Sequence, residues 1–434
     1  MKSVLEIVID DIEAKRQRSS VYFHYYAGDH RTQFHARSVN PHAALFDSFT
    51  ENLCSLVVDS TVDSLVLTGL VPVDNTDTVG QAAATTQWNL WTRERYQRAF
   101  VEWIRSCEIS GEEAVVITWP TGDGKNKVWF VDSTHCSVIR KDSDPSVLET
   151  VAILRGEGDR LLSLFYQDRV ESYVADNPRY LSANNYRLID TIPNPLGRIP
   201  ASTVHVQSDI KKIIDLQDLL NSLIINGAIL NLKESSPLRV FLGLECDVDE
   251  NGQTVAPFDL QLERNLFLPG AVGDEQKVDV KELGGKDATS LLTKQADSIR
   301  SAIARLTRTP YFLLSGTERP PSGEALRTSE APFLQKLQSR GNIYGDAVAD
   351  SLSDDLVFKG LDSTGLISDR IPFDPIWQSP LIVSRESDSR IVQNLVASGV
   401  KLDHALIYAL GWDKNSAESA VVINQTQILE DQGE

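Results

Sequence analysis

Two long apolar segments constrain this chain more than any other feature of its sequence. In residues 208–232, apolar side chains recur at helical spacing and cover more than one face, and residues 287–308 repeat a helical pattern. A helix that is apolar on several faces needs several neighbours, so the first segment packs in a core or between subunits. The residues between them, 235–286, have strand-like patterns. We therefore expect two helices that hold a small β-rich insert away from the main body.

The chain before residue 207 predicts an α+β unit, in which helices are followed by an antiparallel sheet. Residues 72–87 are expected to form a loop, and the aromatic stretch Tyr22 to His30 ends at a Gly-Asp turn signal. The expected helices are 3–18, 42–60 and 88–107. The expected strands are 62–70, 114–117, 128–131, 151–154 and 161–166.

The segment after the second apolar helix predicts a loop and then another long helix. Thr309-Pro310 ends the apolar helix, because the residue before a proline disfavours helical backbone. Ser315 to Pro321 combines glycine, a Pro-Pro pair and charge, which is typical of a loop. A helix is expected from Ser322 to about Leu356, with Gly341 and Gly345 as points where it could kink. The tail, about 385–432, predicts short helices.

The charge of the chain argues against tight binding of duplex DNA. Its net charge is −19 over 434 residues, whereas DNA affinity depends on clustered Lys and Arg. An acidic wall suits a conduit past which DNA slides, but an ordinary acidic protein has the same composition, and both interpretations stay open. Four scattered cysteines favour a reducing compartment. The acidic N-terminus predicts no signal peptide, and no apolar run is long enough for a membrane helix.

The motifs tested for chemistry predict no catalytic site. Residues 121–125 resemble a phosphate-binding loop but lack its glycine and hydroxyl positions, so a hairpin turn is expected. Residues 247–252 match half of a calcium loop, and a hairpin turn or a cation site are the two alternatives. We interpret the early histidines as surface or interface residues that strand-like alternation scatters over different faces. They are His24, His30, His35 and His42. We expect no enzyme activity, cofactor or metal.

A series of short motifs, in order along the chain, resembles the phage portal proteins of the siphophage type. The most telling begins the helix behind the loop and consists of Ser322, Gly323, Glu324, Ala325, Leu326 and Arg327. The other matching elements are Tyr25–His30, Asn52 with Val57–Asp59, Val62-Asp63 and Gly69, Tyr166–Val170 with Tyr173, Pro195–Pro200, Leu216–Asn221, Phe267–Gly270 and Thr309-Pro310. Each motif alone is weak, but together they cover about residues 20–360.

The resemblance implies an α+β portal fold with named parts. These are a wing (1–207), a first stem helix (208–232), a β-rich clip (233–286), a second stem helix (287–310), a tunnel loop (311–321), a second wing part with a long kinked helix (322–385) and a helical crown (386–434). It further implies a DNA-facing loop made of Ser315, Gly316, Thr317, Glu318, Arg319 and Pro320. On the second stem helix, Lys294, Arg300, Arg305 and Arg308 are candidates either for phosphate contacts or for ion pairs between subunits.

The same resemblance implies the partners. It predicts a homo-oligomeric ring, of about twelve copies in the family, through which double-stranded DNA enters and leaves the capsid during packaging and ejection. Expected partners are the large terminase subunit, the head–tail adaptor, and the major capsid and scaffolding proteins, with no membrane. The protein would reside at the capsid vertex of the virion and in the host cytoplasm during assembly. Another virion structural protein, such as an adaptor or capsid subunit, or a cytosolic α+β enzyme are the alternatives.

Overall fold

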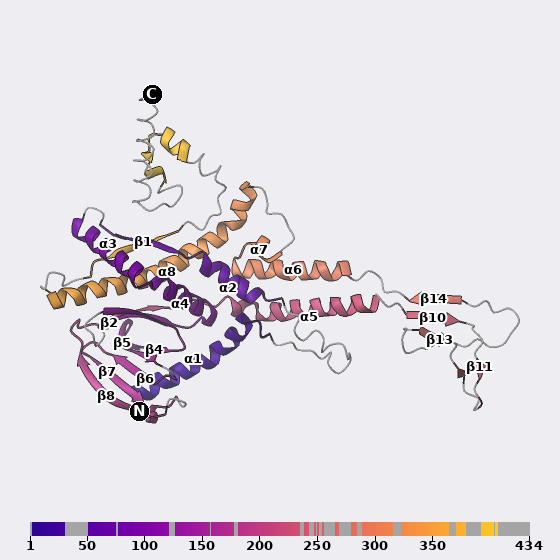
Figure 1. Ribbon diagram of the computed structural model, residues 1–434, viewed down its shortest axis with the longest axis horizontal. Helices are drawn as coiled ribbons and strands as arrows, with labels where there is room; N and C mark the ends of the chain where they lie inside the picture. The colour runs from indigo at the N-terminus through magenta and orange to yellow at the C-terminus, as the bar shows by residue number, and fades with distance from the viewer. Residues whose placement is uncertain are drawn as a thin grey trace.

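Two helices leave a broad α+β body side by side and carry a small β-rich insert at their far end (Figure 1). They are α5 (Ile210–Glu234) and α6 (Thr289–Thr307), so both apolar segments are helical as their patterns predicted. The insert consists of β10 (Leu238–Leu242), β11 (Asp247–Val248), β12 (Thr254–Val255), β13 (Asn265–Leu268) and β14 (Asp279–Leu283). This computed structural model describes residues 2–30, 51–74, 77–120, 126–156, 158–177, 181–234, 238–242, 247–248, 250, 254–255, 265–268, 279–283, 289–315, 323–363, 370–378, 392–402 and 404–406.

The body contains a five-stranded antiparallel sheet with the order β4-β5-β6-β7-β8. Its strands are β4 (Cys136–Lys141), β5 (Asp144–Arg155), β6 (Leu161–Phe165), β7 (Arg169–Ala175) and β8 (Tyr186–Pro193). A second sheet, β3-β2-β9, consists of β2 (Ala114–Pro120), β3 (Asn126–Val131) and β9 (Ala201–Val204). The predicted strands after the first helices are therefore confirmed, but they lie in two antiparallel sheets rather than one, and each sheet contains further strands.

Two segments far apart in the sequence close the body. β1 (Leu67–Pro72) pairs antiparallel with β15 (Phe373–Trp377), and the two strands form a sheet of their own. The predicted strand over 62–70 thus begins later, because α2 (Leu53–Asp63) continues to Asp63. Of the predicted helix 42–60, residues 42–50 lie outside the described residues.

Helices in the first hundred residues differ from the prediction. α1 (Val4–Tyr26) is longer than 3–18, because a Ser3/Glu6 capping box starts it and no breaker intervenes before Gly28, whose φ is +88°. His24 therefore lies on a helix, which makes the strand-like context expected for it wrong. The expected loop 72–87 and helix 88–107 are instead α3 (Thr78–Arg93) and α4 (Tyr96–Ser110), separated where Arg95 adopts φ +55°.

The long helix after the loop region is α8 (Gly323–Ser363), which packs against β15. Gly341 and Gly345, which were expected as points where the helix could kink, lie where α8 closely approaches β15, and the kink itself stays a prediction. A Cβ on Gly345 would lie 2.4 Å from Pro375 Cγ, and one on Gly341 would lie 3.2 Å from Trp377 Nε1. The residue that removes a helical hydrogen bond is Pro332.

The two strand pairs that flank the motifs tested for chemistry are hairpins, as predicted. β2 and β3 pair antiparallel up to Pro120 and Asn126, and β11 pairs antiparallel with β12. Residues 121–125 and most of 247–252, including the possible cation ligands, lie outside the described residues. Of the predicted tail helices, 392–397 is described and is helical. No helix in the described parts of the chain is long and apolar enough to cross a bilayer.

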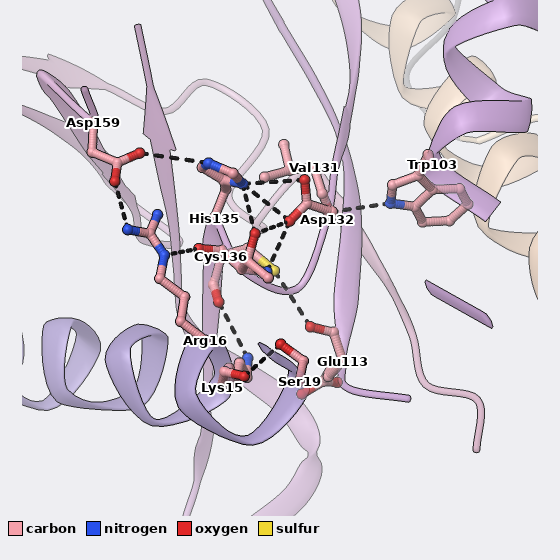
Figure 2. A network of polar contacts seen from close by, with 11 residues as sticks. Lys15, Arg16, Ser19, Trp103, Glu113, Val131, Asp132, His135, Cys136 and Asp159 are labelled. Carbon is pink, nitrogen blue, oxygen red and sulfur yellow. Dashed lines mark hydrogen bonds and ion pairs between the residues drawn. The ribbon is translucent and has the colours of Figure 1, made fainter. Parts of the chain in front are cut away.

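A polar network fastens α1 to the turn between β3 and β4 (Figure 2). The buried Lys15 donates to the carbonyl of Cys136 at 3.2 Å, and Arg16 donates to that of Thr134 at 2.7 Å. His135 Nδ1 lies 3.0 Å from Asp132 Oδ1. The hydrogen bond with Asp132 raises the pKa of His135. Burial opposes ionisation of Asp132, but the hydrogen bonds from His135 and Thr134 outweigh burial and lower the pKa of Asp132.

Candidate functional site

The root of α5 is clasped to the first helices of the body by two buried amides one turn apart. Gln217 accepts a hydrogen bond from the Leu53 N–H at 3.0 Å and donates to the Glu51 carbonyl at 2.5 Å. Asn221 accepts from the Glu51 N–H at 3.1 Å, and its amide nitrogen lies 2.7 Å from His30 Nδ1. Both side chains are almost fully buried, and they satisfy main-chain groups of the half-buried Glu51 and the buried Leu53. The Leu216–Asn221 motif therefore anchors the stalk.

The neighbouring motif positions support the same junction. The Tyr25 hydroxyl donates to the carboxylate of Asp218 at 2.8 Å, and the Asn52 amide donates to the Tyr26 carbonyl at 2.9 Å. Tyr26 in turn donates to Asp59 at 2.8 Å. The early Tyr-Tyr element and the α2 element thus act through contacts that hold the two helical layers together, which sequence alone could not show.

The four basic candidates on the second stalk helix have different surroundings. Arg300 binds within the chain, donating to Glu51 at 2.7 Å and to Asp297 at 2.9 Å, so it fastens α6 to the body. Lys294, Arg305 and Arg308 are exposed. Of the four candidates, Arg300 is therefore paired within the chain, whereas the other three side chains are accessible to a partner.

Large apolar side chains are exposed on and beside the two stalk helices. Leu291 is 58% exposed, Leu219 and Leu306 are 49% exposed, and Leu313 is 38% exposed. Leu219 lies on α5, Leu291 and Leu306 on α6, and Leu313 on α7 (Tyr311–Ser315). These leucines are apolar surface that the described residues of this chain leave uncovered.

α6 ends in a left-handed turn that redirects the chain towards the predicted loop. Arg308 has φ +55°, and the Thr309 N–H donates to the Ala304 carbonyl at 3.0 Å, as in a Schellman cap. Pro310 follows and prevents the helix from continuing. Thr309-Pro310 therefore acts as the stop signal that the sequence indicated.

The expected loop 311–321 is partly helical. Tyr311–Ser315 forms α7, and the Ser315 side chain is buried, so it does not belong to an exposed loop. Gly316, Thr317, Glu318, Arg319 and Pro320 lie outside the described residues, as does Ser322. Gly323 to Arg327 begin α8, as the motif predicted.

A basic hollow of about 440 Å³ lies where the start of α5, the end of α6 and the middle of α8 meet. Its walls include His205, Lys212, Arg308, Lys336 and Arg340. These residues come from three separate parts of the sequence, around 205–212, 308 and 336–340, and no motif connects them. Sequence reasoning proposed only Arg308 among them.

Two buried carboxylates hold the inner cations of the hollow. Asp209 binds Lys336 at 2.5 Å and Lys212 at 2.7 Å, and Glu108 lies 2.9 Å from Arg340 Nε. Burial opposes ionisation of Asp209, but the two lysines outweigh it and hold its pKa below the usual value. Burial raises the pKa of Glu108. The inner wall is thus an ordered ionic network, not a set of free side chains.

A third motif is buried against α8. The Asn194 amide donates to the Tyr166 and Arg198 carbonyls at 2.9 and 2.7 Å, and Gly197 has φ +63°. Arg198 donates to the buried Asp354 at 2.5 Å. The Pro195–Pro200 element therefore makes a tight turn that places an arginine against α8, and its role is structural.

The described residues contain no group of three or more His, Cys, Asp or Glu side chains that could hold a metal ion. Cys54, Cys107 and Cys136 are free and buried, and burial raises the pKa of the Cys54 thiol to about 12. A thiol with that pKa carries almost no thiolate at neutral pH, so it is a poor nucleophile.

Comparison with known proteins decides the family. The family model described as "Phage portal protein, SPP1 Gp6-like" matches residues 5–420. The chain belongs to this phage portal family. The match extends well beyond the residues about 20–360 in which the motifs were recognised. Portal proteins are structural, non-enzymatic components of the virion that form the portal at a capsid vertex, which excludes the alternative of a cytosolic enzyme.

Relatives with curated sequences are distant. The portal proteins of Mycobacterium phages D29 and L5 are 28% and 26% identical over 149 residues, which is 33% of this chain and 29% of each relative. The matched region thus spans less than a third of those portal proteins.

Solved structures with a similar fold come from gene transfer agent particles. A chain of the native neck, computed with C12 symmetry, is 12% identical, with 82% of this chain and 88% of that chain covered and a TM-score of 0.43. A chain of the native virion is 11% identical, with 90% and 92% covered and a TM-score of 0.45.

Proposed function

We propose that this portal protein assembles into a closed ring of about twelve copies around a channel for double-stranded DNA. The observation that carries the proposal is the stalk. α5 and α6 extend from the body with exposed leucines, although a pair of isolated helices in water gains nothing from exposing them. Neighbouring stalks packed around an axis would cover these leucines and enclose a passage.

The parts of the chain would then have distinct places. α5 and α6 form the stem, the insert 233–286 forms the clip, and residues 1–207 with 322–385 form the wing. The tail after 386 forms the crown, and residues 316–320, between α7 and α8, form the tunnel loop. The Leu216–Asn221 clasp supports this division, because it fixes the root of α5 to the body.

Contacts with DNA in such a channel would be sparse and made to phosphate. The chain carries a net charge of −19, so a channel built from it repels the duplex on average and lets it slide. Exposed Lys294 and Arg305, with Arg319 on the loop, are the proposed contacts with phosphate, whereas the carboxylate of Glu318 on the same loop would keep the duplex from binding tightly. ATP hydrolysis belongs to the large terminase subunit, which we propose docks on the clip during packaging and gives way to the head–tail adaptor.

The wing would face the major capsid and scaffolding proteins during assembly in the host cytoplasm. Its large aromatic core, including Trp91, Phe100, Trp103 and Tyr344, makes it the rigid base that a shell could hold. The clip and loop would then be the parts that exchange partners.

The test deletes the proposed tunnel loop. Residues 316–320 are deleted, whereas Ser315 is kept because it is buried in α7. Light scattering after size-exclusion chromatography should show rings of unchanged mass. Packaged DNA, or its retention in filled particles, should fall. As a control, deletion of residues 178–180 in the wing should leave both unchanged.

Two results would contradict the proposal in different ways. A wild-type chain that stays monomeric or dimeric under assembly conditions would refute the ring. A loop deletion that packages and retains DNA normally would refute the loop assignment alone.

A further inference from the structure

The basic hollow at the wing–stem junction has more positive charge than its own chain neutralises. Four cations, Lys212, Arg308, Lys336 and Arg340, face two carboxylates, Asp209 and Glu108. This local excess of positive charge occurs in a chain whose net charge is −19. A concave, partly desolvated site with surplus cations favours an anionic group more strongly than a flat surface would.

The hollow is built rigidly, so it is a preformed receptor. Besides Asp209, Lys336 binds the Thr307 carbonyl at the end of α6 at 3.2 Å, and its side chain is only 8% exposed. Arg340 donates to the Gln207 carbonyl at 3.0 Å. These contacts fix the wall between the strand end, α6 and α8. An incoming anion would therefore meet cations whose positions are already set.

Arg308 is the cation most free to bind a partner. It is exposed, and no ion pair joins it to another described residue. It occupies the left-handed position of the α6 cap, where a glycine would carry no strain. The left-handed turn at Arg308 directs the main chain away from α6, and it occurs at the rim of the hollow. A long cationic side chain at that rim can close over a group held inside.

The shape and the rim of the hollow favour a protein partner over DNA. Leu306 lines the same hollow and is 49% exposed. A phosphodiester backbone on a convex duplex gains nothing from an exposed leucine, and it cannot reach a recessed ammonium such as that of Lys336. An apolar side chain beside recessed cations is instead typical of a protein interface that a side chain enters.

We infer that the basic hollow receives a carboxylate side chain from the adjacent copy of this chain in the ring. The inference rests on the proposed ring. A second copy is the fitting donor because it is strongly acidic, with 61 Asp and Glu residues against 42 Lys and Arg. In a closed ring each copy would offer the hollow on one side and a carboxylate on the other, as a head-to-tail contact requires.

The first test reverses the charge at the rim in the full-length chain. Arg308→Glu should raise the protein concentration needed for half-assembly by about tenfold, measured by native mass spectrometry and light scattering. Wild-type assembly should weaken as salt rises from about 0.1 M to about 1 M, and that dependence should be smaller in the variant. Arg187→Glu, the same change on exposed β8 of the wing, is the matched control and should assemble normally. Circular dichroism and thermal unfolding check that each variant is folded.

The second test identifies the donor. Rings are assembled from a mixture of isotope-labelled and unlabelled chains and treated with a zero-length carbodiimide cross-linker. Lys212, which is 38% exposed, should be joined to an Asp or Glu of the other isotopic form. Cross-links from Lys212 only within one chain would overturn the inference.

The outcomes separate this inference from the ring itself. If the wild-type chain forms no ring, the proposed function fails. If wild-type rings form and Arg308→Glu assembles equally well, the ring stands and the inference fails. If Arg308→Glu rings assemble normally but lose DNA retention, the hollow serves phosphate and the inference is overturned in favour of DNA.

Discussion

Replacing Gln217 with leucine tests whether the amide clasp holds the stem on the wing. Gln217→Leu keeps the size of the side chain but leaves the buried Leu53 N–H and the half-buried Glu51 carbonyl without their partner. Each unsatisfied buried group costs about 1–3 kcal/mol. The added apolar burial of leucine offsets about 1–2 kcal/mol of that. We expect a net loss of about 2 kcal/mol, concentrated at the junction.

Hydrogen–deuterium exchange of the assembled protein measures this locally. A loss of about 2 kcal/mol corresponds to about thirtyfold faster exchange for the amides at the start of α2 and in the first turns of α5. Ser222→Ala is the matched control, because Ser222 donates only to the Asp218 carbonyl of its own helix, and its exchange should stay near the wild type. Equal protection in Gln217→Leu and Ser222→Ala would show that the amide clasp does not hold the helix.

Two further predictions concern packing and pH. Gly345→Ala should destabilise the wing by about 1–2 kcal/mol, because the steric clash of the new Cβ with the Pro375 ring costs more than the gain in helix propensity. Gly227→Ala should stabilise α5 instead, because the nearest atom to its new Cβ is 3.6 Å away. Thermal unfolding of both variants measures the two opposite changes in stability. His135→Asn should destabilise the fold most near pH 6. The raised pKa of His135 gives stability that is present at low pH and lost as pH rises through that pKa, so the difference from the wild type should shrink over that rise. A pH-independent difference in urea midpoint would refute the role of the Asp132 contact.

The stalk could be predicted because its signal is local. Helical periodicity in 208–232 and 287–308 and the Thr309-Pro310 stop depend only on neighbouring residues, and the structure confirms both helices within a few residues. The break at Arg95 was missed because a non-glycine residue in the left-handed region carries no marker in the sequence. β8 was missed because nearly all of its residues are exposed, which leaves no alternation of apolar residues to recognise. β4, β7 and β9 were missed because their buried and half-buried residues do not alternate regularly.

The contacts that matter most for the site connect residues far apart in the sequence. Asp209 and Lys336 approach each other only because α5 and α8 meet at the end of α6, and Gln217 reaches the backbone of Glu51 across more than a hundred residues. The Leu216–Asn221 motif indicated that these residues matter but not what they bind. Side-chain chemistry that depends on tertiary packing cannot be read from spacing alone.

The pairing of β1 with β15 has a consequence for the order in which the molecule is made. Residues 67–72 leave the ribosome early, yet their partner strand, 373–377, emerges only after the stem, the insert and α8. Until then the growing polypeptide lacks a completed wing and has no finished surface to offer a neighbour. We therefore expect a chain that ends before residue 373 to leave the edge of β1 unpaired, which is a site where strands of other chains can add.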